Sequence, residues 1–546
     1  MTQTQISNKP AIGWTPMLFI GLGIALIIMD ATIVIVILPS IIADLKISSL
    51  DAEWINAIYS LTFAALLIVM GRLGDRYGRR KIFVLGAAFF GLSSLLAASA
   101  ATGAFLIFAR AMQGVGGAMM SPTSLSMVNA LYRGKSRAIA FAIYGSVIGG
   151  MAAVGPLAGG WLTQTYSWHW SFWINVPISI LIVFGCLKYV PESKAEGDVG
   201  SADYVGAVLS TVGVAALIFA LIEGRNYGWW YSTSDHQFIG REWLAGAISP
   251  VALALVISAF TLTALYFYES RLTRNNKYPL IDFDLFKIKT FGLGSFAGLI
   301  ISLGEFGLLF SLPLFLQSVL GWSALGAGGL LVMLAVGSFM AAPTAAQLAN
   351  KRNPRFVLRL GLILEILGVV GIAATVQPST SGWIIGGWLL IYGMGVGYAT
   401  AQLTGLILSD IPIEKSGQAS GAQGTARQIG AAMGTAVLGT IVFVSLYNRT
   451  EANITSADTA YPAAYAQGIA KSVEASAGTV IPSLGVSEGP VIQDAAERAF
   501  ADSVRLTGFA AAGFLLLGLL SSLALPPGDA HSREGEDTNE LIHDFE

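Results

Sequence analysis

The chain has 546 residues, of which 54% are hydrophobic and only 12% charged, and its mean hydropathy is +0.67. Soluble globular proteins carry about 25% charged residues, so this composition is typical of a protein embedded in a membrane. The formal net charge of −2 offers no basic surface for nucleic acid, and the single cysteine, Cys186, excludes a disulfide framework and a thiolate metal site.

Apolar runs of the length that crosses the hydrocarbon, about 20 residues, recur along the chain. The first sixteen residues are polar and have no cleavage-site pattern, so the first run is interpreted as a retained helix. Fourteen transmembrane helices are predicted, near residues 17–38, 53–70, 81–101, 105–130, 137–163, 168–189, 204–222, 243–267, 290–316, 325–349, 356–376, 381–409, 424–447 and 504–525.

The basic residues set the expected topology, because cytoplasmic loops are enriched in lysine and arginine. With a cytoplasmic N-terminus, the inside loops hold most of the clustered basic residues, including Arg72, Arg76, Arg79, Arg80, Lys81, Arg133, Arg137, Arg271, Arg274, Lys351, Arg352 and Arg355. The short connections on the other side carry none near residues 102, 164, 318 and 377. We therefore predict that both termini are cytoplasmic. The polar segment 448–502 is then an extracellular loop, and its part near 493–504 has the spacing of a surface helix.

An internal repeat divides the predicted helices into two sets of six. The segment 70–85 (MGRLGDRYGRRKIFVL) aligns with 345–360 (AAQLANKRNPRFVLRL), and each joins two helices on the cytoplasmic side. Parallel repeats of this kind are typical of transporters whose two halves move about a central site. The predicted divisions are a tail (1–16), a six-helix bundle (17–190), a linker with two inserted helices (191–289), a second six-helix bundle (290–525) and a cytoplasmic tail (526–546).

A glycine-rich basic loop carries the first family resemblance. The sequence at 71–81, GRLGDRYGRRK, resembles the signature loop between helices two and three of the major facilitator superfamily. The resemblance implies a latch between the two halves, built from Gly71, Gly74, Asp75, Arg76, Gly78, Arg79 and Arg80. The plain alternative is that the basic residues only hold the loop inside.

Further motifs narrow the resemblance to the fourteen-helix drug:proton antiporters. Asp30-Ala31-Thr32 resembles their acidic first-helix motif, and Arg110 to Gly114 resembles their helix-four arginine motif. The stretch 145–160, centred on Gly155-Pro156, is similar to the helix-five antiporter motif, and 168–177 to the start of helix six. The resemblance implies an all-α integral membrane protein with the major facilitator fold. For Gly155 and Pro156, close packing and gating are both open interpretations.

Charged residues inside the predicted spans are candidates for the site, because a charge at mid-bilayer costs roughly 3 kcal/mol or more. Asp30 and Arg110 lie at similar predicted depth and are expected to face each other, either as a structural ion pair or as a proton- or cation-binding site. Glu305, with no evident basic neighbour, is the second candidate for proton or cation binding, with a passive role as the alternative. Glu365 is interpreted as structural. Arg427 is interpreted as an interfacial arginine, and the alternative is that it neutralises the cytoplasmic gate.

Other function classes lack their sequence features. No loop houses a nucleotide domain, the four histidines form no catalytic cluster, and no repeated filter loop indicates a channel. We predict a monomeric, non-enzymatic antiporter of the cytoplasmic membrane, without cofactor, metal or nucleic acid. It would export lipophilic, cationic drugs or toxic compounds in exchange for protons. The alternatives are a dedicated exporter of a lipid, siderophore or metabolite, and a proton-coupled uptake symporter.

Overall fold

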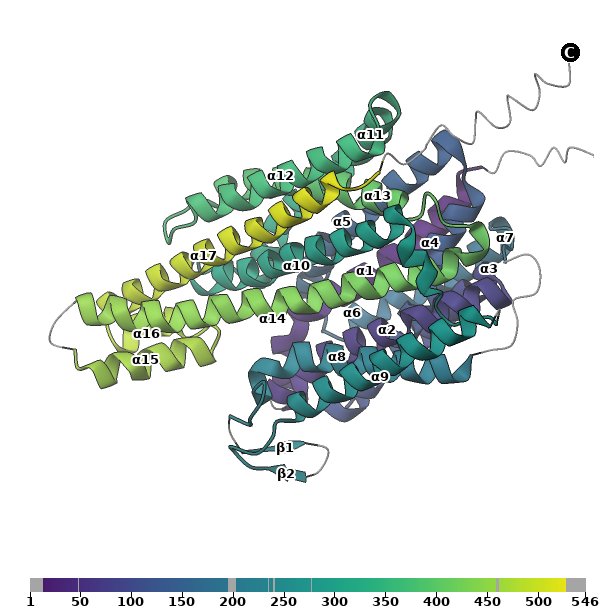
Figure 1. Cartoon of the computed structure of the whole chain (residues 1–546). Helices are drawn as coiled ribbons and strands as arrows, with labels where there is room; N and C mark the ends of the chain where they lie inside the picture. The colour runs from purple at the N-terminus through teal and green to yellow at the C-terminus, as the bar shows by residue number, and fades with distance from the viewer. Residues whose placement is uncertain are drawn as a thin grey trace, which may run out of the picture.

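The computed structural model of the chain describes residues 13–47, 49–194, 203–233, 235–238, 241–275, 277–457 and 461–526. Long helices run side by side through almost all of it (Figure 1). Thirteen described helices are long and apolar enough to cross a membrane. A further long helix, α4 (Gly103–Leu131), lies among them and packs against α2 and α3. Buried Arg110 and Gln113 reduce the apolar character of α4. When α4 is added to the thirteen helices, the total is the predicted count of fourteen.

The N-terminal half is one bundle in which α1 packs against α5 and α4 against both α2 and α3. The helices besides α4 are α1 (Thr15–Leu45), α2 (Ser49–Tyr77), α3 (Arg79–Ala98), α5 (Gly134–Thr165), α6 (Trp170–Trp173) and α7 (Asn175–Tyr189). The single span predicted at 168–189 is therefore two helices. Pro177 explains the break, because proline lacks an N–H and its ring crowds the carbonyl of Trp173.

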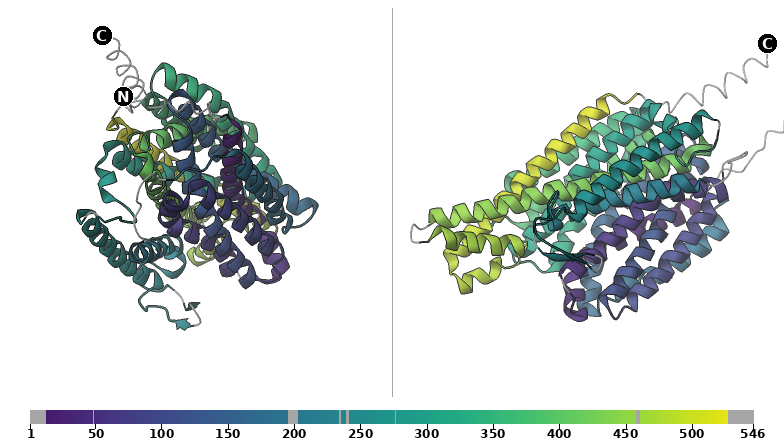
Figure 2. Two further views of the ribbon diagram at one scale, coloured as in Figure 1. Left: turned by 90° about the vertical axis from the view of Figure 1, so that its right-hand side faces the viewer. Right: turned by 60° about the horizontal axis from the view of Figure 1, so that its bottom comes forward.

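The C-terminal half is a second bundle, in which α10 packs against α14 and α17, and α12 against α13. Its long helices are α10 (Lys289–Ser318), α11 (Ala324–Lys351), α12 (Pro354–Thr375), α13 (Gly382–Ile407), α14 (Ser416–Ala457) and α17 (Pro490–Leu523). Figure 2 shows this half, in teal to yellow, beside the N-terminal half in purple and blue. The halves meet where α5 packs on α11 and α13, and where α2 packs on α14.

Two inserted helices, α8 (Tyr204–Tyr227) and α9 (Pro250–Arg274), pack on each other, and α8 also contacts α2 and α14. The pair therefore lies at the seam between the two halves. A short antiparallel hairpin, β1 (His236–Phe238) with β2 (Arg241–Trp243), joins them, so the eighth span begins later than the predicted residue 243. Two short 3-10 helices, η1 (Phe283–Lys287) and η2 (Ile413–Lys415), precede α10 and α14.

The segment 448–502 is largely helical where it is described. At 42 residues, α14 is about 63 Å long, twice the thickness of the hydrocarbon, and its last turns project from the bundle (Figure 1). The helix α15 (Ala463–Ala475) packs on α14, with Ala466 and Val473 buried, and α16 (Ile481–Ser487) packs on α17, with Leu484 buried. Residues 493–504 are helical, as their spacing predicted, but they form the first turns of α17 and bury Ala496, Ala499 and Phe500 instead of lying on the surface.

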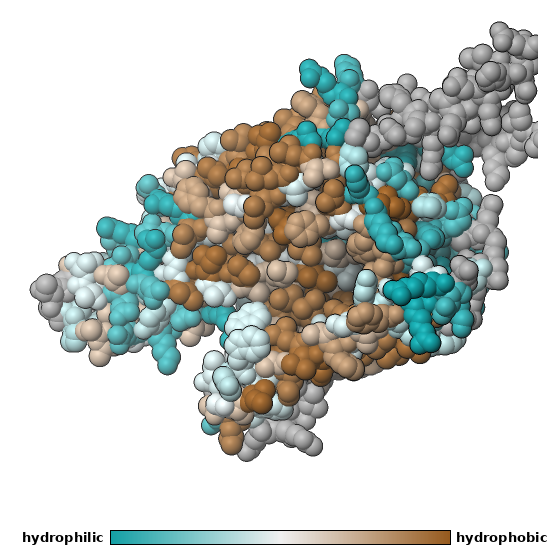
Figure 3. Space-filling view, viewed as in Figure 1, coloured by the Kyte–Doolittle hydropathy of each residue, from teal (hydrophilic) through white to brown (hydrophobic). Residues whose placement is uncertain are grey.

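The two ends of the bundle differ in charge. We call the end with Arg79, Arg80, Arg133 and Arg352 the basic end. The first and last described residues lie there, since Tyr132 Oη donates to the carbonyl of Gly13 and Arg355 Nη1 to that of Leu525. The end with α15, α16 and the hairpin is the far end. Between the two ends, the visible face carries a continuous hydrophobic band (Figure 3). This band is the surface that contacts lipid.

Candidate functional site

The predicted latch residue Asp75 joins the two halves at the basic end. It is fully buried in the last turn of α2, and its Oδ1 accepts hydrogen bonds from Arg79 Nη2 at 2.8 Å and from the N–H of Gly417 at 2.9 Å. Oδ2 accepts from the N–H of Gln418 at 3.1 Å. The helix α14 begins at Ser416, so these N–H groups have no partner within their own helix. Asp75 therefore caps the positive end of a helix that belongs to the other half.

Neighbouring contacts strengthen this connection. Arg79 also donates to the carbonyl of Ile413, and Asn129 Nδ2 donates to Ser416 Oγ at 2.7 Å. Gly71 lies so close to the backbone of Gly417 that a Cβ at either position would overlap the other chain segment. The two backbones approach this closely because both residues are glycine.

The other members of the predicted loop stay within the N-terminal half. Gly74 packs on Thr123 of α4, and Gly78 has a φ of +114°, a conformation that favours glycine. Arg76 lies over the ring of Tyr77, with its guanidinium carbon 5.2 Å from the ring centre. Arg80 donates to the carbonyl of Val190 at 3.1 Å. The described contacts of the predicted set with the C-terminal half are made by Gly71, Asp75 and Arg79.

Asp30 and Arg110 face each other, as the sequence predicted. Both are fully buried, and Arg110 Nη1 lies 2.5 Å from Asp30 Oδ2. Asp30 Oδ1 also accepts hydrogen bonds from Gln113 Nε2 at 3.0 Å and from Asn175 Nδ2 at 2.6 Å. The Arg110 guanidinium stacks over the ring of Tyr59, 4.3 Å from its centre. This network therefore ties four helices, α1, α2, α4 and α7, together inside the N-terminal half.

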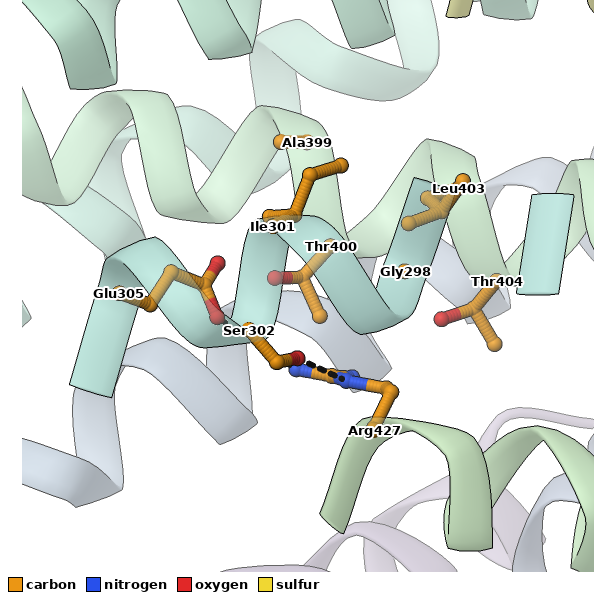
Figure 4. A pocket seen from close by; sticks show the side chains of 9 residues that line it. All are labelled: Gly298, Ile301, Ser302, Glu305, Ala399, Thr400, Leu403, Thr404 and Arg427. Carbon is orange, nitrogen blue, oxygen red and sulfur yellow. Dashed lines mark hydrogen bonds and ion pairs between the residues drawn. The ribbon is translucent and has the colours of Figure 1, made fainter. Parts of the chain in front are cut away.

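Glu305 lies in a pocket with Arg427, which corrects the expectation that it has no basic neighbour. Arg427 Nη2 is 3.9 Å from Glu305 Oε2, and Arg427 Nε is 3.4 Å from Ser302 Oγ. Figure 4 shows Arg427 of α14 reaching towards Ser302 and Glu305 of α10, with Thr400 and Thr404 of α13 on the other side. The Arg427 side chain is 22% exposed and points into this pocket, so its interpretation as an interfacial arginine is wrong.

A second pocket adjoins the first and is lined by both halves. It shares Glu305, Arg427 and Thr400 with the first, and adds residues from the C-terminal half and from α5 of the N-terminal half: Ile148, Gly149, Ala152, Phe306, Leu334, Tyr392 and Val396. Its wall is mostly apolar, with one acid, one base, one phenol and one hydroxyl. Such a wall suits a lipophilic molecule whose charged or polar group is oriented at one place. Asp30 and Arg110 do not line either pocket.

The predicted helix-five motif packs on partners from both halves. Gly155 faces α1, where a Cβ would lie 2.7 Å from the carbonyl oxygen of Met29. Pro156 faces the other half, because a Cβ on Gly328 of α11 would lie 3.2 Å from the Pro156 carbonyl oxygen. Gly145 lies against the backbone of Ala401. Small residues in α5 therefore allow it to lie between α1 and the C-terminal half.

Sequence reasoning missed most of the pocket. Arg427 was visible as an intramembrane charge, but the rotation of α14 that turns it towards Glu305 has no sequence signal. In the sequence, Tyr392 is one of several aromatic residues that could stack on a cargo, and Thr400 looks like an ordinary residue of an apolar helix. Asn175 gave a weak signal, because it is a polar residue two positions before the helix-breaking Pro177. Among the described residues, no group of three or more His, Cys, Asp or Glu side chains could hold a metal ion.

Comparison with known proteins agrees with this architecture. Residues 20–435 match the family model of the Major Facilitator Superfamily. The multidrug efflux pump LfrA of Mycolicibacterium smegmatis is 31% identical over 515 residues, covering 93% of this chain and 95% of LfrA. The tetracenomycin C resistance and export protein of Streptomyces glaucescens is 30% identical, covering 80% of this chain and 78% of that protein.

Solved structures show the same fold at low sequence identity. The human organic anion transporter MFSD10 superimposes with a TM-score of 0.57 at 13% identity, covering 93% of this chain and 99% of that one. An inward-facing bacterial homologue of the lysosomal transporter Spinster has a TM-score of 0.51 at 19% identity, covering 93% and 97%. With its family match, fold and efflux relatives, the chain belongs to the major facilitator superfamily of transporters and is a multi-pass protein of the cytoplasmic membrane.

Proposed function

We propose that this protein is a proton-coupled antiporter that exports lipophilic, cationic drugs or toxic compounds by alternating access. The observation that carries the proposal is the pocket between the halves, where Glu305 lies beside Arg427 within a largely apolar wall. The relatives LfrA, a multidrug efflux pump, and the tetracenomycin C resistance and export protein support export as the direction.

The basic end is proposed to face the cytoplasm, because lysine and arginine are retained on that side of the membrane. The Asp75 bonds to Gly417 and Gln418 then close the cytoplasmic side of the transporter. Loading cargo from the cytoplasm requires these bonds to break and the halves to rock apart at that end. A capping bond is suited to this role because water replaces its partners on opening.

Glu305 is proposed to exchange a proton for the cargo. As a carboxylate it attracts a cationic cargo, and as a carboxylic acid it offers no charge, so binding of one opposes binding of the other. The ion pair between Glu305 and Arg427 is long, at 3.9 Å, so it opposes this exchange only weakly. Asp30 accepts three hydrogen bonds and lies outside both pockets. We therefore propose that the ion pair of Asp30 with Arg110 stabilises the N-terminal half.

The experiment is transport by the purified protein in vesicles with an imposed pH gradient and no membrane potential. A panel of lipophilic cationic dyes is expected to move against its gradient while protons move the opposite way. If cargo and protons move in the same direction, the protein is a symporter. If cargo moves without any dependence on the pH gradient, the proposal of proton coupling fails.

A second candidate function has support from one observation. Arg427 places a fixed positive charge in the pocket, which favours a cargo with an acidic group once Glu305 is protonated. A dedicated exporter of an acidic metabolite would use the pocket in this way. A panel of aromatic carboxylates, run beside the dyes in the same vesicles, separates the two: preferential transport of carboxylates supports the second candidate.

A further inference from the structure

The side chain of Glu365 on α12 is fully buried, and its carboxyl group has no described hydrogen bond. Neither of its oxygens has a hydrogen-bond partner within the described part of the chain. The hydroxyl of Tyr392 on α13, also fully buried, is equally without a described partner, as is Oε1 of Glu305. Three polar groups without described partners in one region of the C-terminal half call for an explanation, because buried polar groups are normally paired.

The backbone brings these groups together. The helices α12 and α13 approach closely at glycines: Gly368, one turn from Glu365, faces Tyr392, and Gly395 faces Glu365 itself. A Cβ on Gly395 would lie 2.7 Å from Glu365 Cγ, so the acid side chain passes over the space that this glycine leaves open. Tyr392 reaches from this helix contact to the pocket that Glu305 lines.

Within the described part of the chain, no charged side chain forms an ion pair with Glu365. The titratable groups whose charges act on it are Glu305 of α10 and Arg427 of α14, and both carboxyls also act on Tyr392 of α13. The charged side chains that tie α12 to α17 bond to backbone carbonyls instead: Arg505 to Ala373 and Val376, and Arg359 to Ser522. The described ion pair of Arg427 is with Glu305.

We propose that Glu365 is a second proton-binding position of the transport cycle, which lies behind α13 and exchanges its proton with Glu305. This rests on the proposed antiport function. An ionised carboxylate at this position would be a buried charge without a partner, so the carboxyl holds its proton in the conformation described.

The exchange involves only a proton and existing groups. In the conformation described, no hydrogen bond joins Glu365, Tyr392 and Glu305, so the transfer takes place when the transport cycle brings them within hydrogen-bond reach. The Glu365 carboxylic acid then gives its proton to the Tyr392 hydroxyl oxygen as that hydroxyl gives its own proton to the Glu305 carboxylate. Glu305 releases this second proton after its own, and both carboxylates are reloaded with protons from the other side of the membrane, so one cargo molecule is exchanged for two protons.

The test is the number of protons exchanged per cargo molecule. In vesicles held at zero membrane potential, the logarithm of the limiting cargo ratio rises with the pH difference with a slope equal to that number. Each coupled proton adds a factor of about ten per pH unit. Glu365→Gln, which has the shape of the neutral acid, is expected to lower the slope by one and the limiting ratio about tenfold at one pH unit. Exchange of labelled for unlabelled cargo should continue, because the pocket is intact.

Controls separate this inference from the proposed function. Glu414→Gln, the same change at an exposed position of η2, should leave the slope at the wild-type value. Glu365→Met also lacks a titratable group, so its slope should be lowered by one as in Glu365→Gln. It is used as the test variant if Glu365→Gln does not insert into the membrane. A wild-type slope in either exchange-competent variant overturns the role of Glu365. A wild-type protein with zero slope instead overturns the antiport function.

Discussion

Arg427 Nη2 lies 3.9 Å from Glu305 Oε2, whereas Arg110 Nη1 lies 2.5 Å from Asp30 Oδ2. The first pair is in a pocket that both halves line, and the second is enclosed in one bundle by further hydrogen bonds. A loose pair beside open space exchanges partners at low cost, whereas a tight buried pair does not. On this difference we base the proposal that Glu305 exchanges protons and that Asp30 supports the N-terminal half.

Removing the charge of Arg427 should change which cargo is preferred. Arg427→Gln keeps a donor near Ser302 but removes the positive charge, so transport of lipophilic cations should improve relative to carboxylates, by about tenfold for 1.4 kcal/mol of lost repulsion. The measurement is the ratio of cation to carboxylate transport in the same vesicles. Arg427→Lys, which keeps the charge, is the control and should retain the wild-type ratio. An unchanged ratio in Arg427→Gln would show that this charge does not face the cargo.

Neutralising Asp75 should open the basic end. Asp75→Asn loses the negative charge that faces the N–H groups of Gly417 and Gln418, which should weaken the closed state by about 1–2 kcal/mol. Opening is measured as the labelling rate of Leu67→Cys, a buried position on the seam beside Gly424, in a background where Cys186 is changed to alanine.

In this assay, Asp284→Asn is the matched control. Asp284 is exposed and pairs with Lys287 in η1, away from the contact between the halves. Faster labelling in Asp75→Asn than in the control supports the latch. Equal labelling rates in the two variants would mean that Asp75 does not hold the halves together.

The Asp30 network gives a prediction about stability and coupling. Arg110→Ala leaves Asp30 as a buried charge without its cation and should destabilise the protein by about 3–5 kcal/mol. Asp30→Asn leaves the buried Arg110 cation without its carboxylate, but it keeps an oxygen that accepts from Gln113 and Asn175, so the variant should fold with a smaller loss of stability than Arg110→Ala. Thermal unfolding in detergent measures the first effect. Loss of proton-driven transport in a stable Asp30→Asn variant would instead assign direct coupling to Asp30.

The close approach of α5 to the C-terminal half should not tolerate a side chain. In Gly145→Ala the new Cβ would overlap the backbone of Ala401, and relieving the overlap should cost about 1–3 kcal/mol. Gly387→Ala on α13 is the matched control, because no atom lies within 4 Å of its new Cβ. Melting temperatures of the two purified variants check this. A Gly145→Ala variant as stable as the control would show that the contact at Ala401 is readily displaced.

The sequence carried the features that depend on local composition. Hydropathy identified the fourteen long helices, and the repeat around Asp75 indicated two halves. The Asp30–Arg110 contact followed from helical rise, which places both residues at similar depth, together with the family resemblance, which implies that helices one and four line the central cavity.

The rest of the site depends on how each helix is rotated about its axis. In a helix such as α13, apolar residues cover nearly every face, so no periodic pattern indicates which face meets a neighbour. The orientation of Arg427 towards Glu305, and of Glu365 across Gly395, is decided by packing at glycines distant in sequence. The extent of α14 and α17 was missed for another reason: their outer turns are polar, and a hydropathy scan ends where the hydrocarbon ends.

The most direct test of the account is proton-driven cargo accumulation by wild-type protein and Glu305→Gln in the same vesicles. In the wild type, the logarithm of the cargo concentration ratio across the membrane should rise with the imposed pH difference. Glu305→Gln should still exchange labelled for unlabelled cargo but should not concentrate it, because the pocket remains while its exchangeable proton is lost. Accumulation by Glu305→Gln at the wild-type level and with the wild-type dependence on pH would contradict the account.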